Sequence, residues 1–192
     1  QRGCLDACLL PWLWRNLQPP VAHDKQQMDF LVSLMEQLGL LTRQPLADPI
    51  RWLLPLRLPS TCLEMIPPLL EFGEDVAVVE RRHEFHQALP SGFLAVVISR
   101  CALLCTDETT IWRQALSTKL PGSGGDSQPI QMILCQGALS SVVFRARCEG
   151  GAGSVYRHLL PCVRRFEKEL TGVIDERWPG CTTTVVCHSP SL

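Results

Sequence analysis

The chain has 192 residues, of which 46% are hydrophobic and 19% charged, and its formal net charge is −1 at pH 7. This composition supplies a buried core and excludes a chain that is disordered throughout. The near-neutral balance argues against a nucleic-acid surface as the main purpose of the chain. No apolar run reaches the ~18 residues of a transmembrane helix. Because the chain begins with Gln1 and has Asp6 early on, we expect a piece of a longer protein and no signal peptide.

Ten cysteines are spread along the chain, and none forms the C-x2-C pair that common zinc sites use. Cys101 and Cys105 stand four residues apart in an apolar run, which is typical of small core residues on one helix face. We therefore favour reduced, scattered thiols in a cytoplasmic protein over a disulfide-linked secreted domain.

Two helices are predicted at the start. The first spans Leu9–Leu17 and ends before two prolines, which cannot continue a helix. The second is capped by Asp24 and stops near Gly39. Its apolar residues recur at steps of three and four and predict one apolar face: Met28, Leu31, Leu34, Met35 and Leu38.

Two short β segments, Leu40–Arg43 and Trp52–Leu58, follow around a predicted loop at Pro45–Ile50. Two helices and a β pair outline a winged-helix-like unit. A helix that reads DNA presents basic and amide side chains, whereas this helix offers a nearly neutral outward set: Lys25, Gln26, Gln27, Glu36 and Gln37. Packing against protein is favoured, and nucleic-acid binding stays as the alternative.

The proline-containing stretch Ser60–Phe72 is the predicted linker to a second part. The elements predicted after it are, in order, strand Val76–His86, helix Ser91–Leu104, strand Ile111–Leu120, strands Ile130–Cys135 and Ser140–Cys148, helix Ser154–Trp178 and strand Thr182–Cys187. This β-α-β-β-β-α-β order predicts an α+β fold, a mainly antiparallel sheet covered by two helices.

No motif predicts catalysis. The loop Gly122–Gly125 lacks the lysine of a P-loop and precedes a strand. His83 and His86 lie in a predicted strand, where they would point to opposite faces and could not share a metal. Cys187 and His188 are sequence neighbours, an arrangement that rarely makes a catalytic pair. A cysteine or metal enzyme is the weakest alternative.

Six stretches together resemble one family. They are R-G-C-L-D-A-C-L-L-P-W-L-W (2–14), M-D-F-L-V-S-L-M-E-Q-L-G-L-L (28–41), R-W-L-L-P-L-R-L-P (51–59), H-E-F-H-Q-A-L-P-S-G-F-L-A-V-V-I-S-R (83–100), I-W-R-Q-A-L (111–116) and E-R-W-P-G-C-T-T-T-V-V-C (176–187). Their order and spacing are similar to the COR (C-terminal of Roc) region of Roco proteins. The non-kinase leucine-rich-repeat group, of the malignant-fibrous-histiocytoma-amplified-sequence type, is the most similar. Ala115 departs from the glycine that the family often has after W-R-x.

The resemblance implies a division into residues 1–71, the C-terminal part of the first COR subdomain, and 72–192, the second. It implies a non-catalytic module that packs on the upstream Ras-like GTPase (Roc) domain of the same protein, forms a homodimer and couples nucleotide state to signalling in the cytoplasm. GTP or GDP and Mg²⁺ would bind in that upstream domain, with no cofactor in this chain. The interface candidates are Phe93, Arg100, Trp112 and Arg113. Arg100, a charge in an apolar helix, should find a partner or reach the surface.

Overall fold

The computed structural model describes residues 3–16, 24–38, 40–44, 50–59, 76–105, 109–121, 129–137, 140–149, 153 and 155–188. The chain forms two compact units, Gln1–Pro59 and Ser60–Leu192. The predicted linker at 60–72 lies outside the described residues, so the predicted division after residue 71 stays a prediction. The two units are considered separately below.

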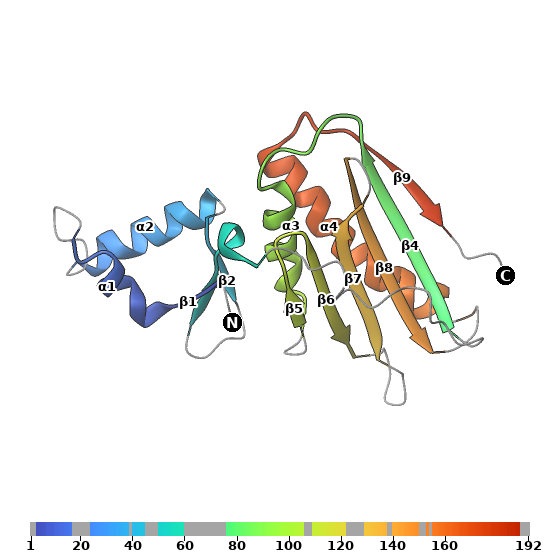
Figure 1. Cartoon of the computed structure of the whole chain (residues 1–192), viewed down its shortest axis with the longest axis horizontal. Helices are drawn as coiled ribbons and strands as arrows, with labels where there is room; N and C mark the ends of the chain where they lie inside the picture. Colours follow the sequence, from blue (N-terminus) through green and yellow to red (C-terminus); the bar gives the residue numbers. More distant parts are fainter. Residues whose placement is uncertain are drawn as a thin grey trace. The chain divides into compact units, whose positions relative to one another are not determined.

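The first unit is a small three-stranded sheet with two helices. In chain order it contains β1 (Cys4–Asp6), the 3-10 turn η1 (Ala7–Leu9), α1 (Leu10–Leu13), α2 (Lys25–Gln37), β2 (Thr42–Gln44), β3 (Arg51–Leu53) and the 3-10 turn η3 (Pro55–Arg57). The strand order is β1-β3-β2, and both pairings are antiparallel (Figure 1). The second predicted helix and the β pair are present, whereas the first helix, predicted over Leu9–Leu17, is the short α1 that ends at Leu13. Strand β1 was not predicted.

Local chemistry sets the ends of these elements. The Asp24 carboxylate accepts hydrogen bonds from the backbone N–H groups of Gln26 (2.9 Å) and Gln27 (3.3 Å), which confirms the predicted cap of α2. The strand predicted to reach Leu58 ends instead at Leu53, because Pro55 begins a 3-10 turn and has no N–H to donate to a sheet.

The core of the first unit is small. Its buried residues include Leu10, Leu41 and Trp52, and α2 adds the partly buried side chains of Val32 and Met35. The indole Nε1 of Trp52 donates a hydrogen bond to Glu36 Oε1 of α2 at 3.0 Å. These few contacts fix α2 to the sheet and leave much of the helix surface uncovered.

The second unit is a six-stranded antiparallel sheet of order β5-β6-β7-β8-β4-β9, with α3 and α4 on one of its faces (Figure 1). Its elements are β4 (Val76–Phe85), α3 (Phe93–Ala102), β5 (Thr109–Ile111), β6 (Ala115–Leu120), β7 (Ile130–Gln136), β8 (Ser141–Glu149), a π-helical turn η5 (Val155–Leu159), α4 (Leu160–Arg177) and β9 (Thr183–His188). The predicted α+β fold is confirmed.

One predicted strand, Ile111–Leu120, is wrong: the chain forms two strands, β5 and β6, joined by a tight turn. The backbone N–H of Trp112 donates to the carbonyl of Ala115 at 2.8 Å and closes the turn. The turn residues W-R-Q include neither glycine nor proline, the usual local signals of a turn. The order is therefore β-α-β-β-β-β-α-β.

The core of the second unit lies between the sheet and the two helices. Helix α4 buries one apolar face, with Val163, Phe166 and Leu170 at 0% exposure, and Leu159 at the end of η5 is buried to the same extent. α3 is buried on most of its surface, as its nearly uncharged sequence requires, and it starts after Gly92, whose φ of 80° few other residues adopt. The predicted core role of Cys101 is confirmed by its complete burial, whereas Cys105 lies beyond the end of α3 and is only partly buried.

Candidate interaction surface

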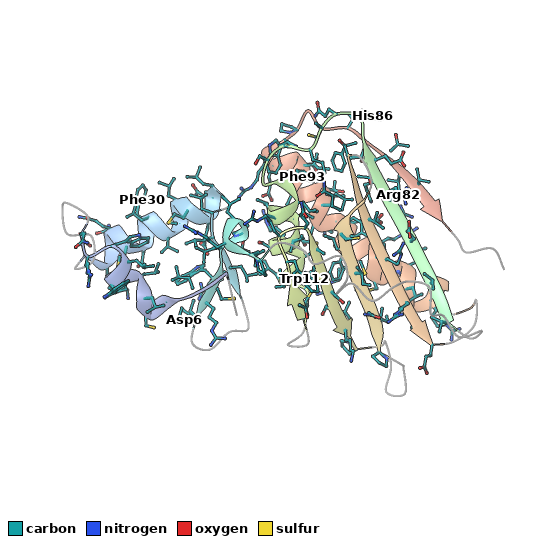
Figure 2. All side chains as sticks on the ribbon, in the orientation of Figure 1. Asp6, Phe30, Arg82, His86, Phe93 and Trp112 are labelled. Atoms are coloured by element: carbon teal, nitrogen blue, oxygen red, sulfur yellow. The ribbon has the colours of Figure 1, made fainter. Side chains whose placement is uncertain are left out.

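Helix α2 and its C-cap residue, Leu38, expose three large apolar side chains in a row. Phe30 is 67% exposed, Leu34 38% and Leu38 59%. They are spaced by four residues, which places them along one side of the helix, and we call them the α2 stripe. Figure 2 labels Phe30 on α2. Exposed apolar residues scattered singly are normal, but a contiguous row of three is typical of a binding surface.

The stripe arises because the apolar part of α2 is wider than the core that it covers. Val32 and Met35 pack against the core of the first unit, yet no side chain of α2 is buried. Leu34 and Leu38, which the sequence places on the apolar face, thus lie outside the core contact. Phe30 extends this outer row by one turn and was not singled out from the sequence, although its spacing of four from Leu34 was visible there.

The charge of α2 does not suit nucleic acid. Lys25 is its only cation, and it carries the two acids Asp29 and Glu36. Binding to phosphates depends on lysine and arginine, and an outward row of phenylalanine and leucine offers phosphates no contact. The stripe therefore favours an apolar protein surface as the partner.

Exposed apolar side chains are concentrated in the first unit. Ten large hydrophobic residues in the described part of the chain are exposed, and nine of them belong to this unit. Beyond the stripe they include Leu9 (46%), Trp12 (59%) and Leu13 (49%) around α1. The guanidinium carbon of Arg15 lies 4.5 Å from the centre of a Trp12 ring, a cation–π contact. The tenth residue is Val185 of β9.

Two interface candidates predicted from the sequence lie in the interior. Phe93 has 0% exposure, and its ring centre is 5.2 Å from that of Phe85 and 5.0 Å from that of Trp178 (Figure 2). Trp112 is 7% exposed in the turn between β5 and β6. Both positions favour a core role over an exposed contact with another protein.

The two other candidates reach the surface. Arg100, in the last turn of α3, forms an ion pair with Glu176 of α4, and its side chain is 33% exposed. Arg100 therefore has an acidic partner and also reaches the surface, the two outcomes expected of a charge in an apolar helix. Arg113 is exposed in the turn after Trp112. The exposed Arg100–Glu176 ion pair contributes at most about 1 kcal/mol to the free energy of unfolding.

A buried polar cluster joins β4 to α4, and the sequence did not reveal it. One carboxylate oxygen of Glu167 lies 2.7 Å from Arg81 Nε and 2.7 Å from His83 Nε2. The His83 ring also meets Phe144 edge-on, with 5.5 Å between ring centres. Burial alone would raise the pKa of Glu167, but the hydrogen bonds from His83 and Arg81 outweigh burial and lower that pKa. Glu167 is thus a buried carboxylate that holds sheet and helix together.

A second group of charges lies on the sheet face opposite the helices. Glu80 of β4 stands directly across from Arg145 of β8, and Arg145 Nε donates to its carboxylate at 2.8 Å. Arg82 makes a longer contact of 3.3 Å with the same carboxylate. Glu80 and Arg145 therefore form a cross-strand pair of the stabilising kind, whereas Arg82 contacts Glu80 along the same strand.

Several thiols and histidines of the described residues are buried or held by neighbouring side chains. Burial is the main cause that raises the pKa of the Cys105 and Cys162 thiols to about 11, so both are protonated near pH 7. His83 is bound to Glu167, whereas Nε2 of His86 lies 3.1 Å from Thr184 Oγ1. Among these residues no group of three or more metal-binding side chains is found.

Comparisons with known proteins add no family assignment. No protein-family model matches the chain, and a search of curated proteins finds no matching sequence. None of the helices in the described ranges is long and apolar enough to cross a membrane.

Proposed function

We propose that this chain is a non-catalytic regulatory module that packs, through the α2 stripe, on a Ras-like GTPase domain of the same protein. The stripe is the observation that carries the proposal, because three exposed apolar side chains in a row call for a protein partner. The resemblance to COR regions names the partner as the upstream Roc domain. The two units of the chain are in keeping with the two subdomains that the resemblance implies.

The energetics suit a partner on the same polypeptide. Burying one Phe or Leu side chain completely contributes about 1.5–3 kcal/mol, and the stripe offers three partly exposed ones. Such a patch is small for two separate proteins, which lose translational freedom on binding. A covalent connection raises the effective concentration of the partner to about millimolar, so a modest interface suffices.

Regulation requires that the docked arrangement differ between the nucleotide states. GTP or GDP, with Mg²⁺, would bind in the GTPase domain, and this module would respond through contacts that only one state offers. Linkage makes the effect reciprocal: if the GTP state binds the module more tightly, the module also favours GTP binding. Such a module has no need of an active site of its own.

Two neighbouring positions on α2 provide a matched test. Leu34→Asp places a charge in the stripe, whereas Ser33→Asp places the same side chain at an exposed polar position one residue away. The full chain is titrated by calorimetry with the isolated GTPase domain at up to about millimolar concentration, which matches the effective concentration of a linked partner. Binding is expected for the wild type and Ser33→Asp, with a loss of at least about tenfold for Leu34→Asp. Equal affinity of all three chains would mean that the stripe does not dock this domain.

A further inference from the structure

Strand β9 forms one edge of the six-stranded sheet, and its outer side offers backbone hydrogen-bonding groups. It pairs with β4 over six residues, from Thr183 opposite Phe85 to His188 opposite Glu80. Within the described part of the chain, no further strand pairs with its other side. An edge of this length is a template for another strand unless the protein protects it.

The usual protections are absent from this strand. Natural edge strands carry lysine, proline or a bulge, whereas β9 reads T-T-V-V-C-H over residues 183–188 and contains no lysine, no acidic residue and no proline. Val185 is 40% exposed, and it is the only exposed large apolar side chain among the described residues of the second unit. β-branched residues also favour the extended conformation.

The opposite edge is protected in a different way. Strand β5 has only three residues, Thr109–Ile111, and a very short edge strand gives a partner little to pair with. The sheet therefore has one edge suited to pairing and one that is not. A contact through β9 alone closes after two copies, whereas two competent edges would lead to open-ended growth.

We infer that β9 pairs antiparallel with β9 of a second copy of this chain, so that two six-stranded sheets join into one. A second copy fits better than a charged peptide because identical edges without charges meet with no like-charge repulsion. Threonine and valine side chains facing each other across an antiparallel pair are mutually stabilising. The inference goes beyond the proposed docking on a GTPase domain, since it names a surface through which two copies of the chain join.

The pleat of the strand limits the possible registers. Val185 stands opposite His83, which contacts Glu167 of α4, so Val185 lies on the helix side of the sheet and its neighbours Thr184 and Val186 lie on the other. A two-fold axis perpendicular to the joined sheet keeps both helix layers on the same side, and facing residues must then share a side. One residue of β9 therefore faces its own copy across the axis, and Val185 and Val186 are the central candidates for it.

Charge at Val185 tests the inference. Analytical ultracentrifugation of the full chain should show a dimer for the wild type and for Val185→Thr, which stays β-branched and uncharged. Val185→Lys and Val185→Glu should each raise the dimer dissociation constant at least about tenfold, because the added like charges face each other in the register centred on Val185 and are diagonal neighbours in the one centred on Val186. A one-to-one mixture of the two variants should restore the dimer, which shows that both chains are folded.

A control on the other edge and the α2 variant separate the possible failures. Thr110→Lys adds the same charge to an exposed position of β5 and should leave the dimer intact. A wild type that stays monomeric, a Val185→Lys chain that still dimerises, or a mixture of the two charged variants that stays monomeric would overturn the inference. Because Val185→Lys should bind the GTPase domain normally while Leu34→Asp should dimerise normally, failure of one proposal can be told from failure of the other.

Discussion

Nε2 of His83 lies 2.7 Å from a carboxylate oxygen of Glu167, although the two residues are 84 positions apart in the sequence. The contact joins strand β4 to helix α4, and Arg81 donates to the same oxygen. Glu167 is only 8% exposed, so the stability of the second unit depends on these donors. An unpaired buried carboxylate would be strongly unfavourable.

Glu167→Ala should lower the free energy of unfolding by about 3 kcal/mol, since it leaves the Arg81 and His83 side chains without their acceptor. This value is the low end for a broken buried pair, because the Arg81 side chain is 22% exposed. Asp175→Asn, at an exposed position of the same helix, should change the unfolding free energy by less than about 0.5 kcal/mol. Urea denaturation of both variants measures the difference, and equal stabilities would contradict the role assigned to Glu167.

The Glu167 carboxylate should make the free energy of unfolding depend on pH. Its pKa is lowered in the folded chain, so its contribution is fully present above the pKa of an unfolded glutamate, about 4.3, and is lost as pH falls through the lower folded value. The stability difference between wild type and Glu167→Gln should therefore be greatest near pH 7 and shrink below about pH 4. Urea midpoints at pH 7, 4 and 3 measure it, and a difference that grows in acid would have the wrong sign.

Much of the fold follows from local sequence patterns, and the rest depends on contacts between distant residues. Strands β4, β7 and β8 and helices α2 and α4 were predicted from periodicity and caps, and the structure confirms them. The turn after Trp112 was missed because its hydrogen bond to Ala115 has no glycine or proline signal. Glu167 looked like one more charge in a mixed helix, since nothing local indicates a partner in β4.

The interaction surface was only half visible in the sequence. Periodicity placed Leu34 and Leu38 on the apolar face of α2, and it could not say how much of that face the rest of the unit would cover. Only the small core around Trp52, which reaches Val32 and Met35, shows that the outer row is left exposed. The extent of a core is a tertiary property that helix periodicity does not contain.

Trp112→Ala should mainly reduce stability. The side chain is 7% exposed, and replacing a buried tryptophan by alanine costs about 3–5 kcal/mol. Arg113→Ala, at the exposed next position, should change the unfolding free energy by about 0.5 kcal/mol or less. Thermal unfolding followed by circular dichroism compares the two. A folded, equally stable Trp112→Ala chain with weaker self-association would instead assign Trp112 to an interface.

The thiols should differ widely in reactivity. Burial raises the pKa of Cys101 well above its ordinary value and that of Cys105 to about 11, whereas Cys8 and Cys187 are exposed. Timed alkylation of the native chain at pH 8, read by peptide mass spectrometry, should label Cys8 and Cys187 first and Cys101 last. Early labelling of Cys101 would show that α3 is not packed as described.

The central claim is that this module senses the nucleotide state of a GTPase domain, and one measurement tests it most directly. The full chain is titrated with the upstream GTPase domain loaded either with GDP and Mg²⁺ or with a non-hydrolysable GTP analogue and Mg²⁺. We expect binding in at least one state and affinities that differ by about fivefold or more, the lower range of allosteric coupling. Equal affinity in both states, or no binding in either, would contradict the proposed function.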